Sequence, residues 1–338
     1  MTAAVRLVSV VVPVMNEESG IVEFNRRLGA VLDSLSCESE ILYVNDGSTD
    51  GTLDILQRLA GQSGNIALLN LSRNFGKEAA MTAGLDHANG DAVAIIDADL
   101  QDPPETIPDL LRVLDLENCD VVYAQRRSRS GETFLKKFTA RMFYRVIGRV
   151  TGIDIPRDTG DFRVLNRRAV DALLKLREHH RFMKGLFAWI GFRQVAVHYD
   201  RDPRFAGESK FNYWRLWNFS LEGITSFTIA PLKVATYVGL FTSLGAAIYG
   251  LAIMIETIVV GNPVPGYPSL LVVVLFLGGL QLLTLGVIGE YLGRVFNESK
   301  HRPLYFVQEF RPRREANAAS LDAMHQRLTG AGFDREIA

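Results

Sequence analysis

Ala92-Val-Ala-Ile-Ile-Asp97-Ala98-Asp99-Leu100-Gln101-Asp102 is an apolar, β-prone run that stops abruptly at two carboxylates. Such a run is typical of a buried parallel strand, and α/β sheets bind ligands just beyond the carboxyl ends of their strands. If the extended conformation persists, Asp97, Asp99 and Gln101 lie on one face. Three oxygen ligands suit Mg²⁺ or Mn²⁺, particularly where a substrate diphosphate completes the shell. The alternative is a strand followed by a plain acidic turn.

Short apolar runs alternate with helix-like segments before residue 200. This alternation predicts an α/β fold, with a mostly parallel sheet and helices on both of its faces. Neither Gly-x-Gly-x-x-Gly nor a P-loop motif follows any of the runs, which argues against both nucleotide-binding folds. The expected strands are Leu7–Val14, Glu40–Asn45, Ala67–Leu71, Ala92–Asp97 and Asp120–Ala124, and the expected helices are Ile21–Ser34, Leu53–Gln62, Glu78–Ala88, Ile107–Leu116 and Arg167–Leu176, with a loop over Asp158–Arg163.

Two long segments without a formal charge lie near the C-terminus. Val234–Ile255 has 22 residues and Ser269–Gly289 has 21, and each is long enough to cross a hydrocarbon core. The connection Asn262–Pro268 contains no lysine or arginine, whereas basic residues lie outside the pair. The positive-inside rule therefore predicts a transmembrane hairpin with both ends in the cytoplasm. The alternative is a helical hairpin buried in a large soluble core.

The overall composition limits the partners. Lysines and arginines (37) nearly balance aspartates and glutamates (38) among the 338 residues, so no net field favours nucleic acid. Cys37 and Cys119 have neither metal-site spacing nor the density of a disulfide scaffold, and they fit a reducing compartment. A strand-like run follows closely on Met1, so no secretory signal is expected.

The remaining segments complete the expected organisation. Thr133–Val150 is basic and amphipathic, while Lys210–Phe227 mixes aromatic side chains with cations, as suits a membrane interface. The chain after Arg302 is expected to be part helix and part disordered. We expect an α/β domain over 1–202, an interfacial segment over 203–230, a hairpin over 231–295 with spans at about 232–257 and 269–289, and a cytoplasmic tail over 296–338.

Two further polar loops follow expected strands. Asn16-Glu17-Glu18 follows the first strand, and Asn45-Asp-Gly-Ser-Thr-Asp-Gly51 follows the second. Helix capping and the helix dipole explain each loop taken singly. However, the carboxyl ends of parallel strands meet at one edge of a sheet, so both loops should converge with Asp97 and Asp99.

Four motifs occur together along the expected sheet edge: Val12-Pro-Val-Met-Asn-Glu-Glu18, Asn45-Asp-Gly-Ser-Thr-Asp-Gly-Thr52, Ser72-Arg-Asn-Phe-Gly-Lys77 and Asp97-Ala-Asp-Leu-Gln-Asp-Pro-Pro-Glu105. They resemble inverting family 2 glycosyltransferases with a GT-A fold. With the paired spans, the chain from about 7 to 300 resembles polyprenyl-phosphate glycosyltransferases of the dolichyl-phosphate mannose synthase type, and most of all the bacterial bactoprenol glucosyltransferases and their aminoarabinose-transferring relatives. Mannose synthases commonly have Ser-Gly in place of Gly160-Asp161, which favours the bacterial subgroup.

The resemblance implies a donor site. A divalent ion there would stabilise the charge of a departing nucleoside diphosphate. Lys77 would add positive charge near that group, although a plain solvated lysine is the alternative. By position, Pro13, Asn16, Glu17 and Asp46 would hold the base and ribose, Asp97 and Ala98 would lie along the nucleotide sugar, and Asp99 and Gln101 would bind Mg²⁺ or Mn²⁺.

The resemblance also implies an acceptor site for a lipid phosphate. The second pKa of a phosphate monoester is near 6, so its oxygen can attack the anomeric carbon without a strong base. Asp99 and Asp161 are the catalytic candidates, with Asp161 acting as a base, orienting the acceptor or shaping a loop. For the basic segment around Lys137, attraction to anionic headgroups is an alternative. The cations expected around the phosphate are Arg126, Lys137, Arg204 and Lys210, with Ser209 beside them.

These features together predict an enzyme of the bacterial inner membrane. We expect transfer of a hexose with inversion, from UDP-glucose to undecaprenyl phosphate, for cell-envelope glycan (lipopolysaccharide) modification. GDP-mannose or UDP-formyl-aminoarabinose as donor is one alternative, and a noncatalytic lipid-binding or translocation protein is another. A processive polysaccharide synthase is disfavoured because Gln-x-x-Arg-Trp is absent. Small residues at Ala246/Gly250 and Gly289/Gly293 allow close helix packing, and the resemblance implies a homo-oligomer such as a tetramer.

Overall fold

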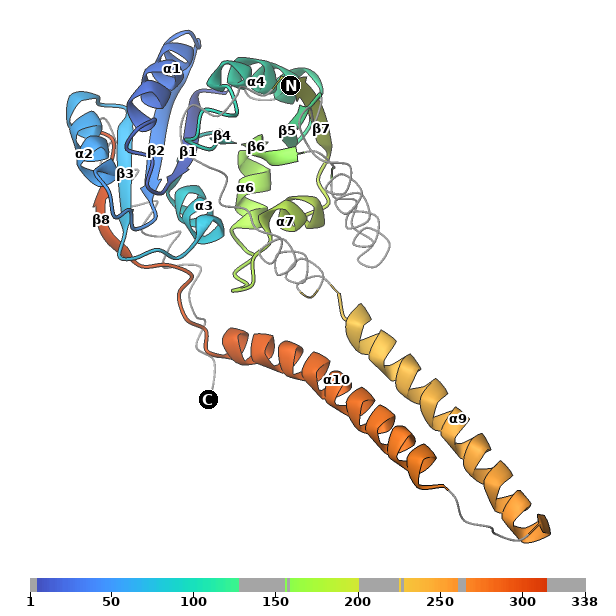
Figure 1. Ribbon diagram of the computed structural model, residues 1–338. Coiled ribbons are helices and arrows are strands. Elements are labelled where there is room, and N and C mark those ends of the chain that lie inside the picture. Colours follow the sequence, from blue (N-terminus) through green and yellow to red (C-terminus); the bar gives the residue numbers. More distant parts are fainter. Residues whose placement is uncertain are drawn as a thin grey trace, which may run out of the picture.

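The structure is a computed structural model that describes residues 5–127, 156, 159–200, 225, 228–260 and 266–314. A sheet domain and two long helices that extend away from it make up these parts (Figure 1). The strands are β1 (Leu7–Val14), β2 (Glu38–Asn45), β3 (Ile66–Leu71), β4 (Ala92–Ile95), β5 (Val121–Arg126), β6 (Thr159–Asn166), β7 (Gln194–Tyr199) and β8 (Val307–Arg311).

These strands form one mostly parallel sheet in the order β7-β5-β6-β4-β1-β2-β3-β8. β1 pairs in parallel with β2 and β4, β2 with β3, and β5 with β7. β6 runs antiparallel between β4 and β5, and β8 runs antiparallel to β3 at the edge. The predicted α/β class with a mostly parallel sheet is confirmed.

Helices cover both faces of the sheet, because alternate β1 side chains point to opposite sides. Val10 and Val12 join the buried cluster that includes Phe24 of one helix layer, whereas Val11 joins the cluster that includes Ala83 of the other. The helices are α1 (Ile21–Asp33), α2 (Thr52–Gln62), α3 (Lys77–His87), the 3₁₀ turn η1 (Pro104–Thr106), α4 (Ile107–Leu116), α6 (Arg167–Leu173), α7 (Met183–Trp189), α9 (Ala230–Val260) and α10 (Tyr267–Ser299).

The expected loop over Asp158–Arg163 is wrong, because residues from Thr159 onward form β6. A Gly-Asp pair at its start signals a turn, but the strand gains hydrogen bonds from neighbours on both sides. Within β6, the Phe162 side chain is fully buried, and the Arg163 guanidinium stacks on the Phe187 ring at 3.7 Å. Tertiary pairing therefore overrides the local turn signal.

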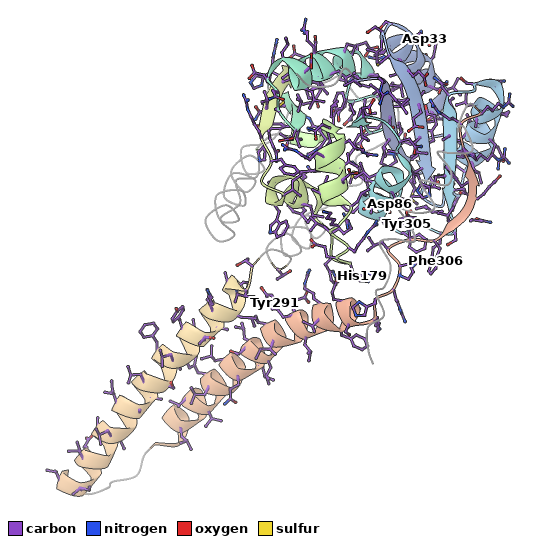
Figure 2. The ribbon with its side chains drawn as sticks, turned by 180° about the vertical axis from the view of Figure 1, so that it is seen from behind. Asp33, Asp86, His179, Tyr291, Tyr305 and Phe306 are labelled. Carbon is purple, nitrogen blue, oxygen red and sulfur yellow. The ribbon has the colours of Figure 1, made fainter. Side chains whose placement is uncertain are left out.

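The expectation of a helical or disordered chain after Arg302 is wrong for residues 307–311. They form β8, which closes the open edge of β3. The Tyr305 hydroxyl donates to the Asp86 carboxylate at 2.7 Å (Figure 2). Phe310 packs against the His87 ring, with 5.0 Å between the ring centres. The chain thus returns from α10 to the sheet and is fixed there.

α9 and α10 are the two candidate membrane spans. Ala230–Ile253 and Phe276–Ser299 are long and apolar enough to cross a bilayer, and neither stretch is buried within the protein. Phe241 is 70% exposed and Leu282 is 72% exposed. A hairpin inside a soluble core would bury such side chains, so the structure argues against that alternative.

Candidate active site

A cavity of about 270 Å³ lies at the carboxyl edge of β1, β2 and β4. It is formed where the three polar loops meet, as expected for a doubly wound sheet. Met15, Asn74 and Gly76 add to its walls. Seven of the residues predicted for the donor line it: Pro13, Glu17, Asp46, Lys77, Asp97, Ala98 and Asp99.

Lys77, the first residue of α3, joins a carboxylate of the cavity wall, Asp97, to Asp161 of β6. Its Nζ lies 2.7 Å from Asp97 Oδ1 and 2.5 Å from Asp161 Oδ2. Burial alone would lower the pKa of Lys77, but the two carboxylates outweigh burial and raise it. Burial likewise acts to raise the pKa of Asp161, yet Lys77 and Lys184 hold it well below its usual range. Asp161 is therefore ionised at neutral pH.

Asp97 differs from Asp161 although both bind the same lysine. Burial raises the pKa of Asp97, Lys77 partly offsets that effect, and the negative charge of Asp161 raises it further. Two close carboxylates that share one cation titrate as a unit. Lys77, Asp97 and Asp161 form one charge cluster, and another anion would compete with the two carboxylates for Lys77.

Asp46 anchors the loop that precedes α3. Its two carboxylate oxygens accept the backbone N–H groups of Phe75 at 2.7 Å and Gly76 at 3.0 Å. Burial raises the pKa of Asp46, and these two hydrogen bonds partly offset the effect. Beside it, Gly47 has φ +67°, and a Cβ there would lie 2.5 Å from the Asn74 nitrogen. The β2 and β3 loops can approach this closely only because residue 47 is glycine.

Asn16 does not line the cavity but holds two loops together. Its Oδ1 accepts the Thr49 N–H at 2.8 Å, and its own N–H donates to Ser48 Oγ at 3.0 Å. Its φ of +55° is one that asparagine tolerates. The Glu17 N–H similarly donates to Thr52 Oγ1 at 2.9 Å. These contacts shape the rim on which a nucleotide would lie.

The extended conformation that would place Asp97, Asp99 and Gln101 on one face does not persist beyond β4, and Gln101 does not join the two aspartates in the cavity wall. β4 ends at Ile95, Leu100 has φ +58°, and Asp99 Oδ1 accepts the Gln101 N–H at 3.1 Å. An aspartate that caps its own turn in this way competes with extended backbone. Gln101 is buried and does not line the cavity, whereas Asp99 does.

The side chains around the cavity indicate how a metal ion could be bound there. Among the described residues, no group of three His, Cys, Asp or Glu side chains is arranged to hold one. Asp99 nevertheless faces the cavity, and Mg²⁺ is often held by one or two carboxylates together with substrate phosphates. One carboxylate in the cavity wall is compatible with an ion that is bound mainly through substrate phosphates.

Of the predicted acceptor residues, Arg126 lies within the described part of the chain. Its Nε donates to the Tyr199 hydroxyl at 3.2 Å, and its Nη2 lies 3.8 Å from Asp102 Oδ1. A Cβ on Gly160 would lie 3.4 Å from that guanidinium, so Arg126 is close to the β6 segment that carries Asp161. Lys137, Arg204, Ser209 and Lys210 lie outside the described residues, and so do the segments Thr133–Val150 and, apart from Thr225, Lys210–Phe227.

Sequence reasoning missed two charged neighbours of Asp161. Lys184 of α7 donates to the Thr159 carbonyl at 3.1 Å and adds to the positive field on Asp161. Glu78 of α3 accepts the Met183 N–H at 3.1 Å, and burial raises its pKa to about 8, with Asp161 adding to the shift. No local signal places α7 against α3, because that contact depends on packing over the sheet.

Comparisons with known proteins show what this chain is similar to. Residues 9–174 match glycosyl transferase family 2, and residues 230–295 match the GtrB C-terminal hairpin. An uncharacterised glycosyltransferase of Synechocystis sp. is 55% identical over 89% of this chain and 94% of its own. A bactoprenol glucosyl transferase of Shigella phage SfV is 48% identical over 89% and 98%. A solved glucosyl-3-phosphoglycerate synthase of Mycobacterium tuberculosis is 18% identical over 65% and 76%, with a TM-score of 0.47.

Proposed function

The chain belongs to glycosyl transferase family 2 and is a GT-A-fold glycosyltransferase, and we propose that it moves a hexose from a nucleotide diphosphate sugar to a polyprenyl phosphate. One observation carries this proposal: Asp46, Asp97 and Asp99 meet in one cavity at the sheet edge, with Lys77 bridging to Asp161. The apolar hairpin supports an acceptor that resides in the membrane. UDP-glucose and undecaprenyl phosphate are the proposed substrates, supported by the name of the phage relative.

The donor would lie along the cavity from Pro13 to Asp99. Mg²⁺ or Mn²⁺ held by Asp99 would supply positive charge for the departing diphosphate. Lys77, which lines the same cavity, would add a second positive charge for the diphosphate. Gln101 would support the metal site indirectly. It is buried, and its backbone N–H donates to the Asp99 carboxylate.

The acceptor phosphate would approach between Arg126 and Asp161. A phosphate monoester is largely anionic at neutral pH, so it does not require a base. Asp161 is also a weak base, because its neighbouring lysines keep its pKa low. We therefore favour a positioning role for Asp161: it holds Lys77 and helps to orient the acceptor for in-line attack. Inversion at the anomeric carbon follows from a single such displacement.

We propose the membrane topology that the distribution of lysine and arginine around the hairpin predicts. The catalytic domain over 1–202 and both termini would lie in the cytoplasm, the segment 203–230 at the interface and the tail 296–338 on the same side. The homo-oligomer also remains a prediction.

A donor screen tests the proposal. Purified full-length protein is mixed with undecaprenyl phosphate, Mg²⁺ or Mn²⁺ and one of UDP-glucose, GDP-mannose or UDP-formyl-aminoarabinose, and release of the nucleoside diphosphate is measured. We expect release with UDP-glucose that requires both the lipid and the metal. Lipid-dependent release of the nucleoside diphosphate from another donor would change only the assignment of the sugar. Release that does not depend on the lipid would overturn the assignment of a polyprenyl phosphate as the acceptor.

A further inference from the structure

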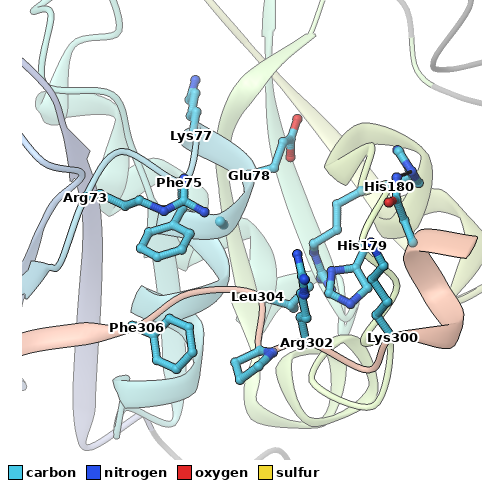
Figure 3. A pocket seen from close by; sticks show the side chains of 15 residues that line it. Arg73, Phe75, Lys77, Glu78, His179, His180, Lys300, Arg302, Leu304 and Phe306 are labelled. Atoms are coloured by element: carbon cyan, nitrogen blue, oxygen red, sulfur yellow. Dashed lines mark hydrogen bonds between the residues drawn. The ribbon is translucent and has the colours of Figure 1, made fainter. Parts of the chain in front are cut away.

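A second and larger cavity, of about 720 Å³, lies between the start of α3 and the end of α10. Figure 3 shows Arg73 and Phe75 on one side of it, and His179, Lys300 and Arg302 on another. The function proposed above does not use this cavity. It nevertheless touches the donor cavity, because Gly76 and Lys77 line both.

One of the residues that line this cavity is a buried arginine. Arg181 lines the cavity and is only 6% exposed. Its Nη1 donates to the Leu176 carbonyl at 2.5 Å and its Nη2 contacts Met183 Sδ at 3.6 Å. Its Nε has no partner among the described residues, which is costly for a buried cation. Burial also lowers the pKa of Arg181, so an anion would stabilise its charged form.

The walls carry an excess of positive charge. In the part of the chain that the structure describes, no carboxylate lies within 4.0 Å of the cationic groups of Arg73, Arg181, Lys300 or Arg302. Glu78 is the acidic residue among the lining side chains, and its pKa of about 8 leaves it largely neutral at pH 7. The first turn of the 11-residue helix α3 adds the positive end of its dipole.

The place of the cavity indicates where its ligand comes from. Lys300 caps α10, which contains the candidate span Phe276–Ser299, so the cavity lies next to one end of that candidate span. The end of α10 is fixed to the sheet domain, because the His179 N–H donates to the Glu298 carboxylate at 3.0 Å. Leu304 and Phe306 provide an apolar wall beside the cations. Charge together with an apolar wall suits an amphiphile better than a free ion.

We propose that this cavity binds the phosphate group of a membrane lipid. Arg73, Lys300 and Arg302 would hold the phosphate, the buried Arg181 would add positive charge from the wall, and the lipid chain would lie against Leu304 and Phe306. The site is separate from the acceptor position near Arg126, which does not line the cavity. It rests on the membrane placement proposed above but not on sugar transfer. A bound headgroup would fix the distance between the donor cavity and the bilayer.

The proposed lipid site is tested by measuring equilibrium lipid binding to the full-length protein in detergent. No nucleotide sugar is added, so the measurement does not depend on catalytic turnover. The probes are short-chain phosphatidylglycerol, undecaprenyl phosphate, short-chain phosphatidylcholine and inorganic phosphate. The test variant is Lys300→Ala with Arg302→Ala, and Arg73→Ala probes the opposite wall. Lys233→Ala is the matched control, because it removes an exposed cation at the same end of the other span, outside the cavity.

We expect the double variant to bind phosphatidylglycerol or undecaprenyl phosphate at least about tenfold more weakly than the native protein, since each interfacial cation contributes roughly 1 kcal/mol. Arg73→Ala should weaken binding in the same direction, and Lys233→Ala should leave it within about twofold. The lipid whose affinity falls identifies the source of the phosphate. Unchanged lipid affinity in both cavity variants would overturn the proposal, and so would inorganic phosphate binding as tightly as either lipid.

Discussion

At the scale of single residues, we expect the contacts of Lys77 to change when a nucleotide sugar binds. Its Nζ is shared between Asp97 and Asp161. A diphosphate carries more charge than either carboxylate and would compete for the same cation. Both carboxylates would then need new partners, and a metal ion or the incoming acceptor can provide them.

Lys77→Met tests this role. The substitution keeps the length of the side chain but removes its charge, which leaves Asp97 and Asp161 to repel each other. We expect UDP affinity, measured calorimetrically, to fall by about tenfold or more, because a charge-assisted contact is lost. Lys175→Met, at an exposed position outside the cavity, is the control. An unchanged UDP affinity in Lys77→Met would make Lys77 a structural residue only.

Glu78 makes stability depend on pH in an unusual direction. Its pKa rises from an ordinary value of 4.5 to about 8, so between these values the folded protein holds a proton that the unfolded chain has lost. Stability should therefore fall as pH rises from about 5 to 8. Glu78→Gln keeps an acceptor for the Met183 N–H and removes the titration.

We expect the melting temperature of Glu78→Gln to fall less than that of the native protein between pH 5 and pH 8. Asp109→Asn is the control, because it changes an exposed carboxylate on α4. Parallel pH profiles of the native protein and Glu78→Gln would show that the Glu78 carboxyl titrates normally.

At the scale of elements, α3 must lie very close to the sheet for Lys77 to reach the cavity. Gly84 makes this possible, because a Cβ there would lie 2.2 Å from Val11 Cγ1 and 3.2 Å from Val44 Cγ2. Both neighbours are fully buried side chains in the sheet. The glycine therefore sets the height of the helix above β1 and β2.

Gly84→Ala should force α3 away from the sheet and destabilise the protein by about 1–3 kcal/mol. Gly29→Ala in α1 is the matched control, since a Cβ there meets nothing within 4 Å. Alanine at that helical position should stabilise by about 0.5–1 kcal/mol. Melting temperatures should move in opposite directions, and UDP affinity should fall for Gly84→Ala alone. A Gly84→Ala protein as stable as Gly29→Ala would contradict this account of α3.

The elements that could be predicted from the sequence are those whose pattern is local. β1 and α4 have the expected bounds, and β2, β3, α1 and α2 differ by one or two residues, because apolar periodicity marks where an element packs. β6, β7 and β8 were missed. β6 and β8 are antiparallel strands and β7 is parallel, but all three pair with strands that lie far away in the sequence.

The same distinction applies to the site. The loops that line the donor cavity could be placed, because strand ends in a parallel sheet meet at one edge. The conformation of Asp99 to Gln101 could not, since a single side-chain hydrogen bond turns the backbone there. Lys184 and Arg181 depend on how α7 packs, which no short motif encodes.

At the scale of the whole molecule, the structure joins a cavity for a soluble donor to helices suited to a membrane. The chain leaves the sheet through α9 and α10 and returns to it as β8, with Tyr305 bonded to Asp86 on the way (Figures 1 and 2). The cationic cavity lies at this return point, beside the donor cavity. Such an arrangement would bring a lipid phosphate and a nucleotide sugar close together, as proposed above.

The central claim is transfer of one sugar to a lipid phosphate at this edge. The most direct measurement is the mass of undecaprenyl phosphate after incubation with full-length protein, UDP-glucose and Mg²⁺ or Mn²⁺. Asp99→Ala is run in parallel, with Asp109→Ala as an exposed control. The account predicts a lipid heavier by one hexose with the native protein and with Asp109→Ala, and unmodified lipid with Asp99→Ala. Unmodified lipid with every nucleotide sugar tested, or full turnover by Asp99→Ala, would contradict it.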